Sequence, residues 1–263
     1  MAEDVRHFQG RDGTKLAYRE TGQGRTLILI HGFTGTGRAS WIGTGFADRI
    51  AERGYRVVMP DMRAHGESAR PHDPAAYPPD VLADDGLALI DELGVDEFDL
   101  AGYSLGGRTV ARLLARGARP GRAVIGGQGF EAVVHTEGRG GRLRRILTSF
   151  GTFAPGSPEQ AMENWITSSG GDPAALVRVL DTFVGTPPEV LATIDVPTLV
   201  LTGAGDGHND TARALAEALP HGRYVMVPGD HLTAVGTPEF ETAMISFLTG
   251  PEPDLAAGEP TAG

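Results

Sequence analysis

The chain has 263 residues, of which 40% are hydrophobic and 22% are charged, a composition typical of a globular domain. The net charge of −11 (23 Lys and Arg against 34 Asp and Glu) disfavours a polyanionic partner such as nucleic acid. The chain has no cysteine, which excludes disulfides, cysteine nucleophiles, thiolate zinc sites and iron–sulfur clusters. No apolar run approaches the ~20 residues of a membrane span. The N-terminal residues lack the pattern of a signal peptide, so we expect a cytoplasmic protein without a membrane span.

Short apolar segments alternate with helical patterns along most of the chain. The first two predicted strands flank the turn at 11–13 and form an opening hairpin. The run at 26–30 is continuously apolar, as expected for a strand covered on both faces of a parallel sheet. The predicted strands are 4–9, 14–21, 26–30, 55–59, 98–102, 123–125, 198–202 and 223–227. The predicted helices are 38–52, 77–93, 105–116, 209–219 and 237–248.

This alternation predicts an α/β fold class with a mostly parallel, eight-stranded, doubly wound sheet. Residues 1–128 and 196–248 would form the core. Residues 129–195 contain no convincing strand but have apolar residues at helical spacing, which predicts a helical lid over a site; ordinary helical padding is the alternative. Residues 249–263 are rich in proline, glycine and acidic residues, which predicts a disordered tail.

The candidate nucleophile is Ser104. Residues 102–106 read Gly-Tyr-Ser-Leu-Gly, a G-x-S-x-G motif between a predicted strand and a predicted helix. A sharp strand-to-helix turn needs glycine on both sides of the serine, and it exposes the hydroxyl at the carboxyl end of the sheet. The N-terminus of the following helix offers free N–H groups to a developing oxyanion.

A second loop supplies a candidate partner for that helix N-terminus. Residues 31–35, His-Gly-Phe-Thr-Gly, follow the predicted strand 26–30 directly. This loop can present the backbone N–H of Phe33 towards the serine. Paired with the N–H of Leu105, it would form an oxyanion hole.

A serine nucleophile needs a base and an acid that orients the base. His231 follows the last predicted strand at its carboxyl end and is the candidate base, with His208 as a weaker alternative. Asp206 ends the Thr-Gly-Ala-Gly-Asp segment after the preceding strand and is the candidate acid. Asp210 and Asp230 are alternatives. The chain order Ser, Asp, His is that of the α/β-hydrolase arrangement.

Five motifs occur in the order expected of the α/β-hydrolase superfamily: HGFTG, DMRAHGESARP at 61–71, GYSLGGR, GAGD and GDH. The sequence strongly resembles that superfamily over about 1–128 and 196–248. The resemblance implies the α/β-hydrolase fold, with the D-x-R-x-H-G-x-S loop at 61–68 bracing the sheet edge near the site. Serine at position 104 argues against epoxide hydrolases and haloalkane dehalogenases, which attack through a carboxylate.

These residues predict a serine hydrolase that cleaves a carboxylic ester, or a thioester or lactone, through an acyl-enzyme. The expected partner is a small-molecule substrate with an acyl group, and no cofactor or metal is expected. The apolar composition of the lid predicts a hydrophobic pocket. Its candidate lining residues are Trp41, Arg108, Phe150, Trp165 and Ile166.

Two other functions are weighed against hydrolysis. HGFTG together with GYSLGGR, including Arg108, looks like the menaquinone-pathway lyase of this fold, which would use His231 as the base for an elimination. That enzyme holds a polyanionic substrate with arginines, and this chain has a basic run of Arg139, Arg142, Arg144 and Arg145, for which a solvated helix face is the alternative. A non-catalytic ligand receptor is the third function, but every catalytic position is filled.

Overall fold

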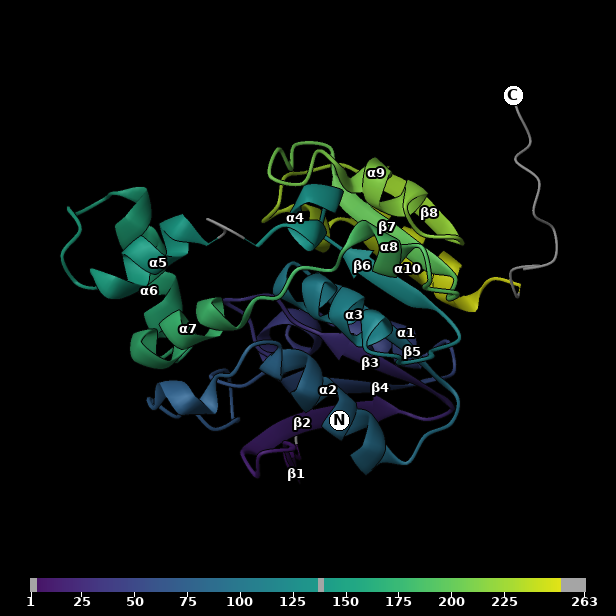
Figure 1. Ribbon diagram of the computed structural model, residues 1–263, viewed down its shortest axis with the longest axis horizontal. Helices are drawn as coiled ribbons and strands as arrows, with labels where there is room; N and C mark the ends of the chain where they lie inside the picture. Colours follow the sequence, from purple (N-terminus) through teal and green to yellow (C-terminus); the bar gives the residue numbers. More distant parts are fainter. Residues whose placement is uncertain (1–3, 137–139, 252–263) are drawn as a thin grey trace.

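The sheet in the computed structural model, which describes residues 4–136 and 140–251, has eight strands in the order β1-β2-β4-β3-β5-β6-β7-β8 (Figure 1). β1 pairs antiparallel with β2, and β2 with β4; the pairs from β4 to β8 are parallel. The strand bounds are β1 (Arg6–Gln9), β2 (Lys15–Gly22), β3 (Arg25–Ile30), β4 (Tyr55–Asp61), β5 (Phe98–Tyr103), β6 (Ala123–Gly126), β7 (Thr198–Gly203) and β8 (Gly222–Val227). The predicted fold class is confirmed.

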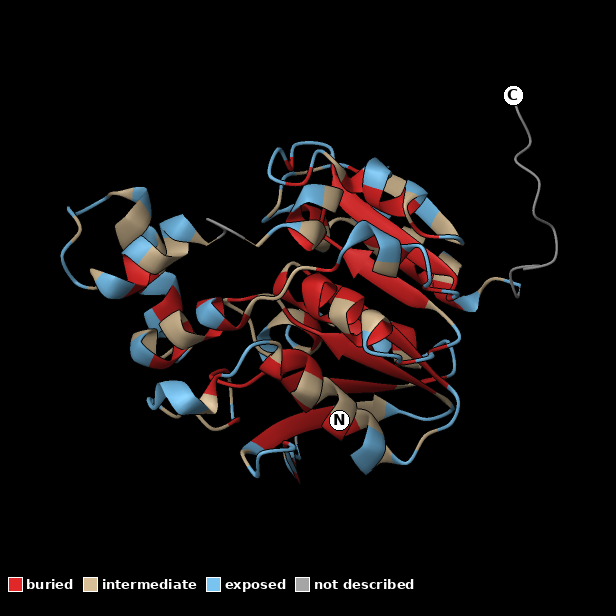
Figure 2. Ribbon diagram, in the orientation of Figure 1, coloured by how far each residue is buried: buried red, intermediate tan, exposed pale blue. Residues whose placement is uncertain are grey.

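Helices cover both faces of the sheet. α2 (Val81–Leu93), α3 (Leu105–Ala115) and α9 (Ala212–Glu217) pack on one face, and α1 (Phe46–Ala51) and α10 (Pro238–Thr249) pack on the other. The central strand β3 divides its side chains between the two layers: Ile28 and Ile30 join the first cluster, and Leu27 and Leu29 join the second. Because successive residues of a strand point to opposite faces, a continuous apolar run is what such a strand requires. The central strands are accordingly buried (Figure 2).

Several predicted helix bounds are wrong for local reasons. The predicted helix 38–52 is a short π-helical turn, Arg38–Ile42, followed by α1, because Gly45 at φ 71° interrupts it. The predicted helix 77–93 begins only at Val81, after Pro78, Pro79 and an Asp80 at φ 66°. Helix α9 is shorter than the predicted 209–219. Helix α10 extends to Thr249, the first residue of the predicted tail, and residues 252–263 lie outside the described part of the chain.

The insertion between β6 and β7 is helical, and α5 to α7 project from the sheet at one side (Figure 1). Its helices are α4 (Phe130–Val134), α5 (Gly141–Thr148), α6 (Pro158–Ser168), α7 (Pro173–Val179) and α8 (Pro188–Leu191). Ser157 and Asp172 cap the N-termini of α6 and α7, each followed by proline at the first helical position. None of the helices in the described ranges is long and apolar enough to cross a membrane.

The insertion leaves and re-enters the core through a narrow neck. The N–H of Thr186 on the returning chain donates to the carbonyl of Val133 on the outgoing chain, at 2.9 Å. Gly185 packs so closely against the carbonyl of Val134 that a Cβ there would overlap it. The two ends of the segment between them therefore lie side by side.

Three contacts tie the projecting helices to loops of the core. The Nη1 of Arg70 donates to the carbonyl of Gly170 at 2.6 Å, and the Nε2 of His72 lies 2.7 Å from the Oδ2 of Asp172. The indole N–H of Trp165 donates to the carbonyl of Thr34 at 3.2 Å. These contacts hold α6 and the start of α7 against the loops that follow β3 and β4.

Candidate active site

Ser104 sits at the turn between β5 and α3 with a strained backbone, φ 55° and ψ −115°. Both glycines of the motif are required by close backbone approach. A Cβ on Gly102 would overlap the backbone of Gly106, and a Cβ on Gly106 would overlap the carbonyl of Ile30. The turn therefore lies pressed against β3, which leaves the serine hydroxyl at the carboxyl edge of the sheet.

Three side chains from different parts of the chain form one hydrogen-bonded series. The Oγ of Ser104 lies 2.9 Å from the Nε2 of His231, and the Nδ1 of His231 lies 2.8 Å from the Oδ2 of Asp206. Because an ionised carboxylate can only accept, Nδ1 carries the proton and Nε2 is left to accept from the serine hydroxyl. The side chain of Asp206 is fully buried and that of His231 is 27% exposed, so the series runs from the interior to an accessible hydroxyl.

Asn209 also belongs to this hydrogen-bond network, and the sequence analysis did not identify it. Its Nδ2 donates to the Oδ2 of Asp206 at 2.9 Å, and its Oδ1 accepts from the N–H of Gly129 at 3.0 Å. Burial raises the pKa of Asp206, but the hydrogen bonds from His231 and Asn209 outweigh burial and hold that pKa below its ordinary value. The carboxylate therefore stays ionised beside the imidazole. A polar residue three positions after the acid, in the same loop, was the available signal.

The alternative residues lie elsewhere. Asp230 is exposed, and its Oδ1 accepts from the N–H groups of Leu232 and Thr233 at 3.0 and 2.9 Å, so it caps the turn that carries His231. Asp210 and His208 are exposed. In this structure Asp206 is the carboxylate that contacts the ring of His231.

The two backbone groups expected to form an oxyanion hole lie at the ends of β3 and β5. In the described part of the chain, neither the N–H of Phe33 nor that of Leu105 donates to another protein group. The 31–35 loop lies against the serine, since a Cβ on Gly32 would come within 3.4 Å of the Cβ of Ser104. Both N–H groups are thus available at the edge where the hydroxyl emerges.

Two buried histidines hold the 31–35 loop in place. The Nδ1–H of His31 donates to the carbonyl of Gly32 at 2.7 Å, and its Nε2 accepts from the N–H of Met62 at 3.0 Å. The ring of His65 lies between the carbonyls of Phe33 and Arg63. These contacts link the loop after β3 to the loop after β4.

His31 makes stability depend on pH. Burial, followed by the nearby His65, lowers its pKa from 6.5 to about 3. The unfolded chain therefore binds this proton first, and the stabilising contribution of neutral His31 is full above pH 6.5 and is lost as pH falls towards 3. In urea titrations between pH 6 and 4, wild type should lose about 1.4 kcal/mol of unfolding free energy per pH unit relative to His31→Gln. His7→Gln, at an exposed position of β1, is the control and should leave the slope as in wild type.

The 61–68 loop braces the same edge through buried charge. The carboxylate of Asp61 accepts from the N–H groups of Gly37 and Glu67, at 2.8 and 2.9 Å. The guanidinium of Arg63 is fully buried and pairs with Asp85 and Asp12 at 2.7 and 2.6 Å. Since breaking a buried ion pair leaves an uncompensated charge, these pairs fix the loop that carries His65.

The predicted pocket residues are scattered. Trp41 and Ile166 are 2% and 1% exposed and belong to the two core clusters, so the structure gives no support to a role for them in an open pocket. Arg108 is also buried; its Nη2 donates to the carbonyl of Ala132, and its guanidinium carbon lies 5.0 Å from the ring centre of Phe183. Phe150 is half-buried, packed against the first cluster.

Trp165, which is 55% exposed, differs from these because its indole N–H reaches Thr34, the neighbour of Phe33. The basic run in α5 pairs with acidic residues: Arg144 with Asp181 and Arg145 with Glu159, at 2.7 and 2.6 Å. Arg142 is exposed, and Arg139 lies outside the described residues. The described members of the run thus lie on a solvent-accessible side of α5.

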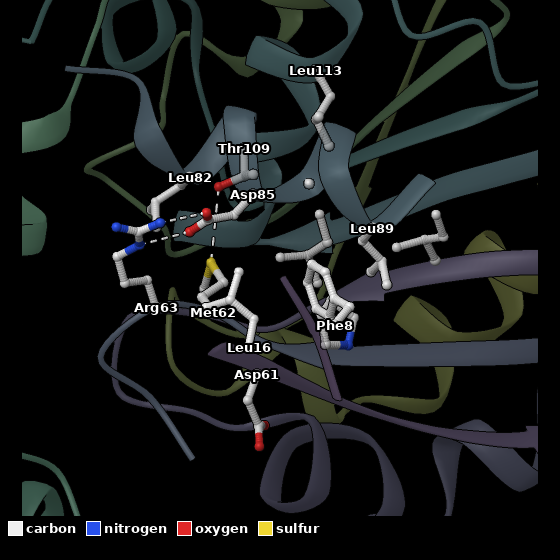
Figure 3. A pocket seen from close by; sticks show the side chains of 14 residues that line it. Phe8, Leu16, Asp61, Met62, Arg63, Leu82, Asp85, Leu89, Thr109 and Leu113 are labelled. Atoms are coloured by element: carbon white, nitrogen blue, oxygen red, sulfur yellow. Dashed lines mark hydrogen bonds and ion pairs between the residues drawn. The ribbon is translucent and has the colours of Figure 1, made fainter. Parts of the chain in front are cut away.

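One small pocket lies away from Ser104, His231 and Asp206. It has a volume of about 20 Å³, room for a single water, between the sheet and helices α2 and α3, with the Arg63–Asp85 ion pair at its edge (Figure 3). Its lining is mostly apolar, so it is a packing gap in the core. Within residues 4–136 and 140–251, no group of three or more His, Asp or Glu side chains is placed to hold a metal ion.

Comparison with known proteins agrees with this geometry. A family model described as alpha/beta hydrolase fold matches residues 25–125. The chain is 29% identical to a non-heme haloperoxidase of Rhodococcus erythropolis, over 74% of this chain and 80% of that protein. It is 33% identical to the 2-hydroxymuconate semialdehyde hydrolase of Pseudomonas sp. (strain CF600), over 52% of each. Other relatives carry the name epoxide hydrolase.

A solved structure of a hydrolase from Pseudomonas aeruginosa PA01 superposes with a TM-score of 0.75 at 25% identity, covering 94% of this chain and 99% of that one. The sheet order, the turn at Ser104 and these relatives lead to one assignment. The chain has the α/β-hydrolase fold and is similar to members of that superfamily.

Proposed function

We propose that the protein is a serine hydrolase that cleaves a carboxylic ester, or a thioester or lactone, through an acyl-enzyme. The observation that carries the proposal is the series Ser104 Oγ, His231 and Asp206, joined at 2.9 and 2.8 Å at the carboxyl edge of the sheet. A half-buried serine in a strained turn, in contact with an imidazole whose other nitrogen faces a buried carboxylate, is suited to nucleophilic attack.

Each group then has one task. The Nε2 of His231 takes the hydroxyl proton while the Oγ of Ser104 bonds to the acyl carbon, and Asp206 stabilises the imidazolium. The N–H groups of Phe33 and Leu105 donate to the oxyanion of the tetrahedral intermediate. His231 returns its proton to the departing alcohol, and a water activated by the same nitrogen releases the acid and restores the serine.

The serine also separates this site from that of an epoxide hydrolase. A carboxylate that opens an epoxide leaves an ester, which water can hydrolyse. A serine hydroxyl that opened an epoxide would leave an ether at Ser104, and the site has no group that cleaves an ether. The relatives named epoxide hydrolases share similarity with this chain, and the serine at position 104 supports the proposed ester chemistry.

The contacts of the arginines do not favour the lyase alternative. It requires arginines to hold a polyanionic substrate, but Arg108 is buried with its guanidinium on the carbonyl of Ala132 and beside Phe183. Arg144 and Arg145 pair with acidic side chains. Three of the five arginines considered for that role thus contact the protein itself.

We propose that residues 129–195 act as the lid of this site. The support is the position of α6, whose Trp165 contacts the loop bearing the Phe33 N–H donor. The exposed ring of Trp165 and the half-buried Phe150 are the apolar side chains we assign to the substrate side of the lid.

Pre-steady-state kinetics test the proposed reaction. Mixing the protein with p-nitrophenyl acetate or butyrate should release a burst of nitrophenol equal to the enzyme concentration, because acylation precedes slower hydrolysis. Mass spectrometry of the quenched protein should place the acyl group on the peptide containing Ser104. Folded protein that gives neither burst nor adduct across graded p-nitrophenyl esters, thioesters and lactones would contradict the proposal.

A further inference from the structure

The loop that follows β6, residues 126–129, connects the serine to the acid. The N–H of Ser104 donates to the carbonyl of Gly126 at 2.9 Å. At the other end, the N–H of Gly129 donates to Asn209, which donates to Asp206. Gln128 lies between these two contacts and is 7% exposed.

The side chain of Gln128 is directed at the backbone of the serine. Its Nε2 donates to the carbonyl oxygen of Ser104 at 2.8 Å. The orientation of the amide is fixed by its partner, since a carbonyl oxygen accepts and only the NH₂ end can face it. Gly107 leaves room for this side chain: a Cβ there would come within 3.2 Å of the Cγ of Gln128.

The other end of the same amide is unfavourably placed. The Oε1 of Gln128 is buried and accepts no hydrogen bond from any residue that the structure describes. A buried amide with an unmet oxygen costs stability, so packing alone would favour an apolar side chain of similar length. Glutamine differs from an apolar side chain of that length because its NH₂ group donates to the carbonyl of Ser104.

That contact acts on the oxyanion hole because of peptide geometry. The carbonyl of Ser104 and the N–H of Leu105 belong to one planar trans peptide group, so they point in opposite directions. Fixing the carbonyl on one side therefore fixes the N–H on the other. The same oxygen also accepts from the N–H of Arg108 at 3.0 Å, and two donors at different angles hold the plane where one would leave it free to rotate. Donation to the carbonyl further polarises the peptide and strengthens its N–H as a donor.

We propose that Gln128 is a positioning residue that sets the direction and donor strength of the Leu105 N–H in the oxyanion hole. The inference rests on the proposed function. Gln128 acts through the Ser104–Leu105 peptide and touches no substrate. Its effect is therefore confined to states in which negative charge has developed on the acyl oxygen.

The test compares Gln128→Met, which keeps the length and removes the donor, with Gln128→Glu, which keeps the shape and places a carboxylate against the Ser104 carbonyl. Both substitutions should lower kcat for p-nitrophenyl butyrate by about 10- to 100-fold and change KM by less than about twofold. This decrease in kcat is no larger than the smallest decrease expected when an oxyanion-hole donor is removed outright. Affinity for a boronic acid that forms a tetrahedral adduct with Ser104 should fall in parallel. Gln23→Met, at an exposed position, is the matched control and should behave as wild type.

Infrared spectroscopy of the acyl-enzyme separates positioning from general stability. With a ¹³C-labelled acyl carbonyl, the stretching band should move to higher frequency in Gln128→Met, because the hydrogen bond from Leu105 is weaker. A wild-type burst with an unmoved band and unchanged boronate affinity in both variants would overturn this inference alone. Neither burst nor acyl adduct in wild type across the esters, thioesters and lactones would overturn the proposed function, and this inference with it. If Gln128→Met does not fold, Gln128→Glu gives the same readouts.

Discussion

Ser104→Ala should lower kcat/KM for p-nitrophenyl butyrate by about four to six orders of magnitude, because it removes the atom that bonds to the acyl carbon. The remaining rate enhancement would come from the N–H donors and from binding, which do not depend on the serine oxygen. The burst and the acyl adduct should disappear together. Steady-state hydrolysis with highly purified protein, at high enzyme concentration, measures the residual rate.

Folding should survive this change. Ser104 makes its structural contacts through its backbone, to Gly126 and Gln128, and the alanine keeps both. The melting temperature should therefore stay close to that of wild type. Ser246→Ala, at an exposed position of α10, is the control for serine loss and should retain full activity. Substantial ester turnover by folded Ser104→Ala protein would show that another group is the nucleophile.

Asp206→Asn should lower kcat by about four orders of magnitude while leaving KM nearly unchanged. Asn209 and His231 both donate to the Oδ2 of Asp206, so in the variant the amide oxygen is expected to keep that position and the NH₂ to take the place of Oδ1. The imidazole then keeps its proton on Nδ1. The neutral amide no longer stabilises the imidazolium that forms when His231 takes the serine proton, and this lost charge lowers kcat. Steady-state kinetics over pH 6–9 measure the loss.

Asp230→Asn is the matched control, since Asp230 lies next to His231 in the chain but caps the turn. The amide oxygen of asparagine can accept from the same backbone N–H groups, so the stability of Asp230→Asn should stay close to that of wild type, and kcat should fall by less than about tenfold. The reverse result, with Asp230→Asn nearly inactive and Asp206→Asn nearly normal, would assign the acid to Asp230. Thermal unfolding of both variants separates instability from loss of chemistry.

Features with a local signature could be predicted from the sequence. The apolar run of β3 indicates a strand that is buried on both faces. The glycines on either side of Ser104 indicate a tight turn in which a Cβ would overlap the neighbouring backbone. Gln128 was missed because its contact with the Ser104 carbonyl spans 24 residues along the chain. Asn209 lies only three residues after Asp206, but the contact with Gly129 that holds its amide spans 80 residues. Trp41 was assigned to the pocket on composition, but it packs on Phe46 at 5.4 Å between ring centres, a placement that depends on tertiary packing.

The contact between Val133 and Thr186 separates the inserted segment between β6 and β7 from the rest of the fold. The hydrogen bond between them joins the two ends of the inserted segment at its base. The entropy cost of closing a loop grows only slowly with its length, so residues can be added to this segment or exchanged at a small cost in stability. The strand pairs and the Ser104 turn lie on the scaffold side of this junction and need not adjust to the exchange. Under the lid role that we propose, sequence changes in this segment would alter which substrates reach Ser104 and leave the catalytic side chains unchanged.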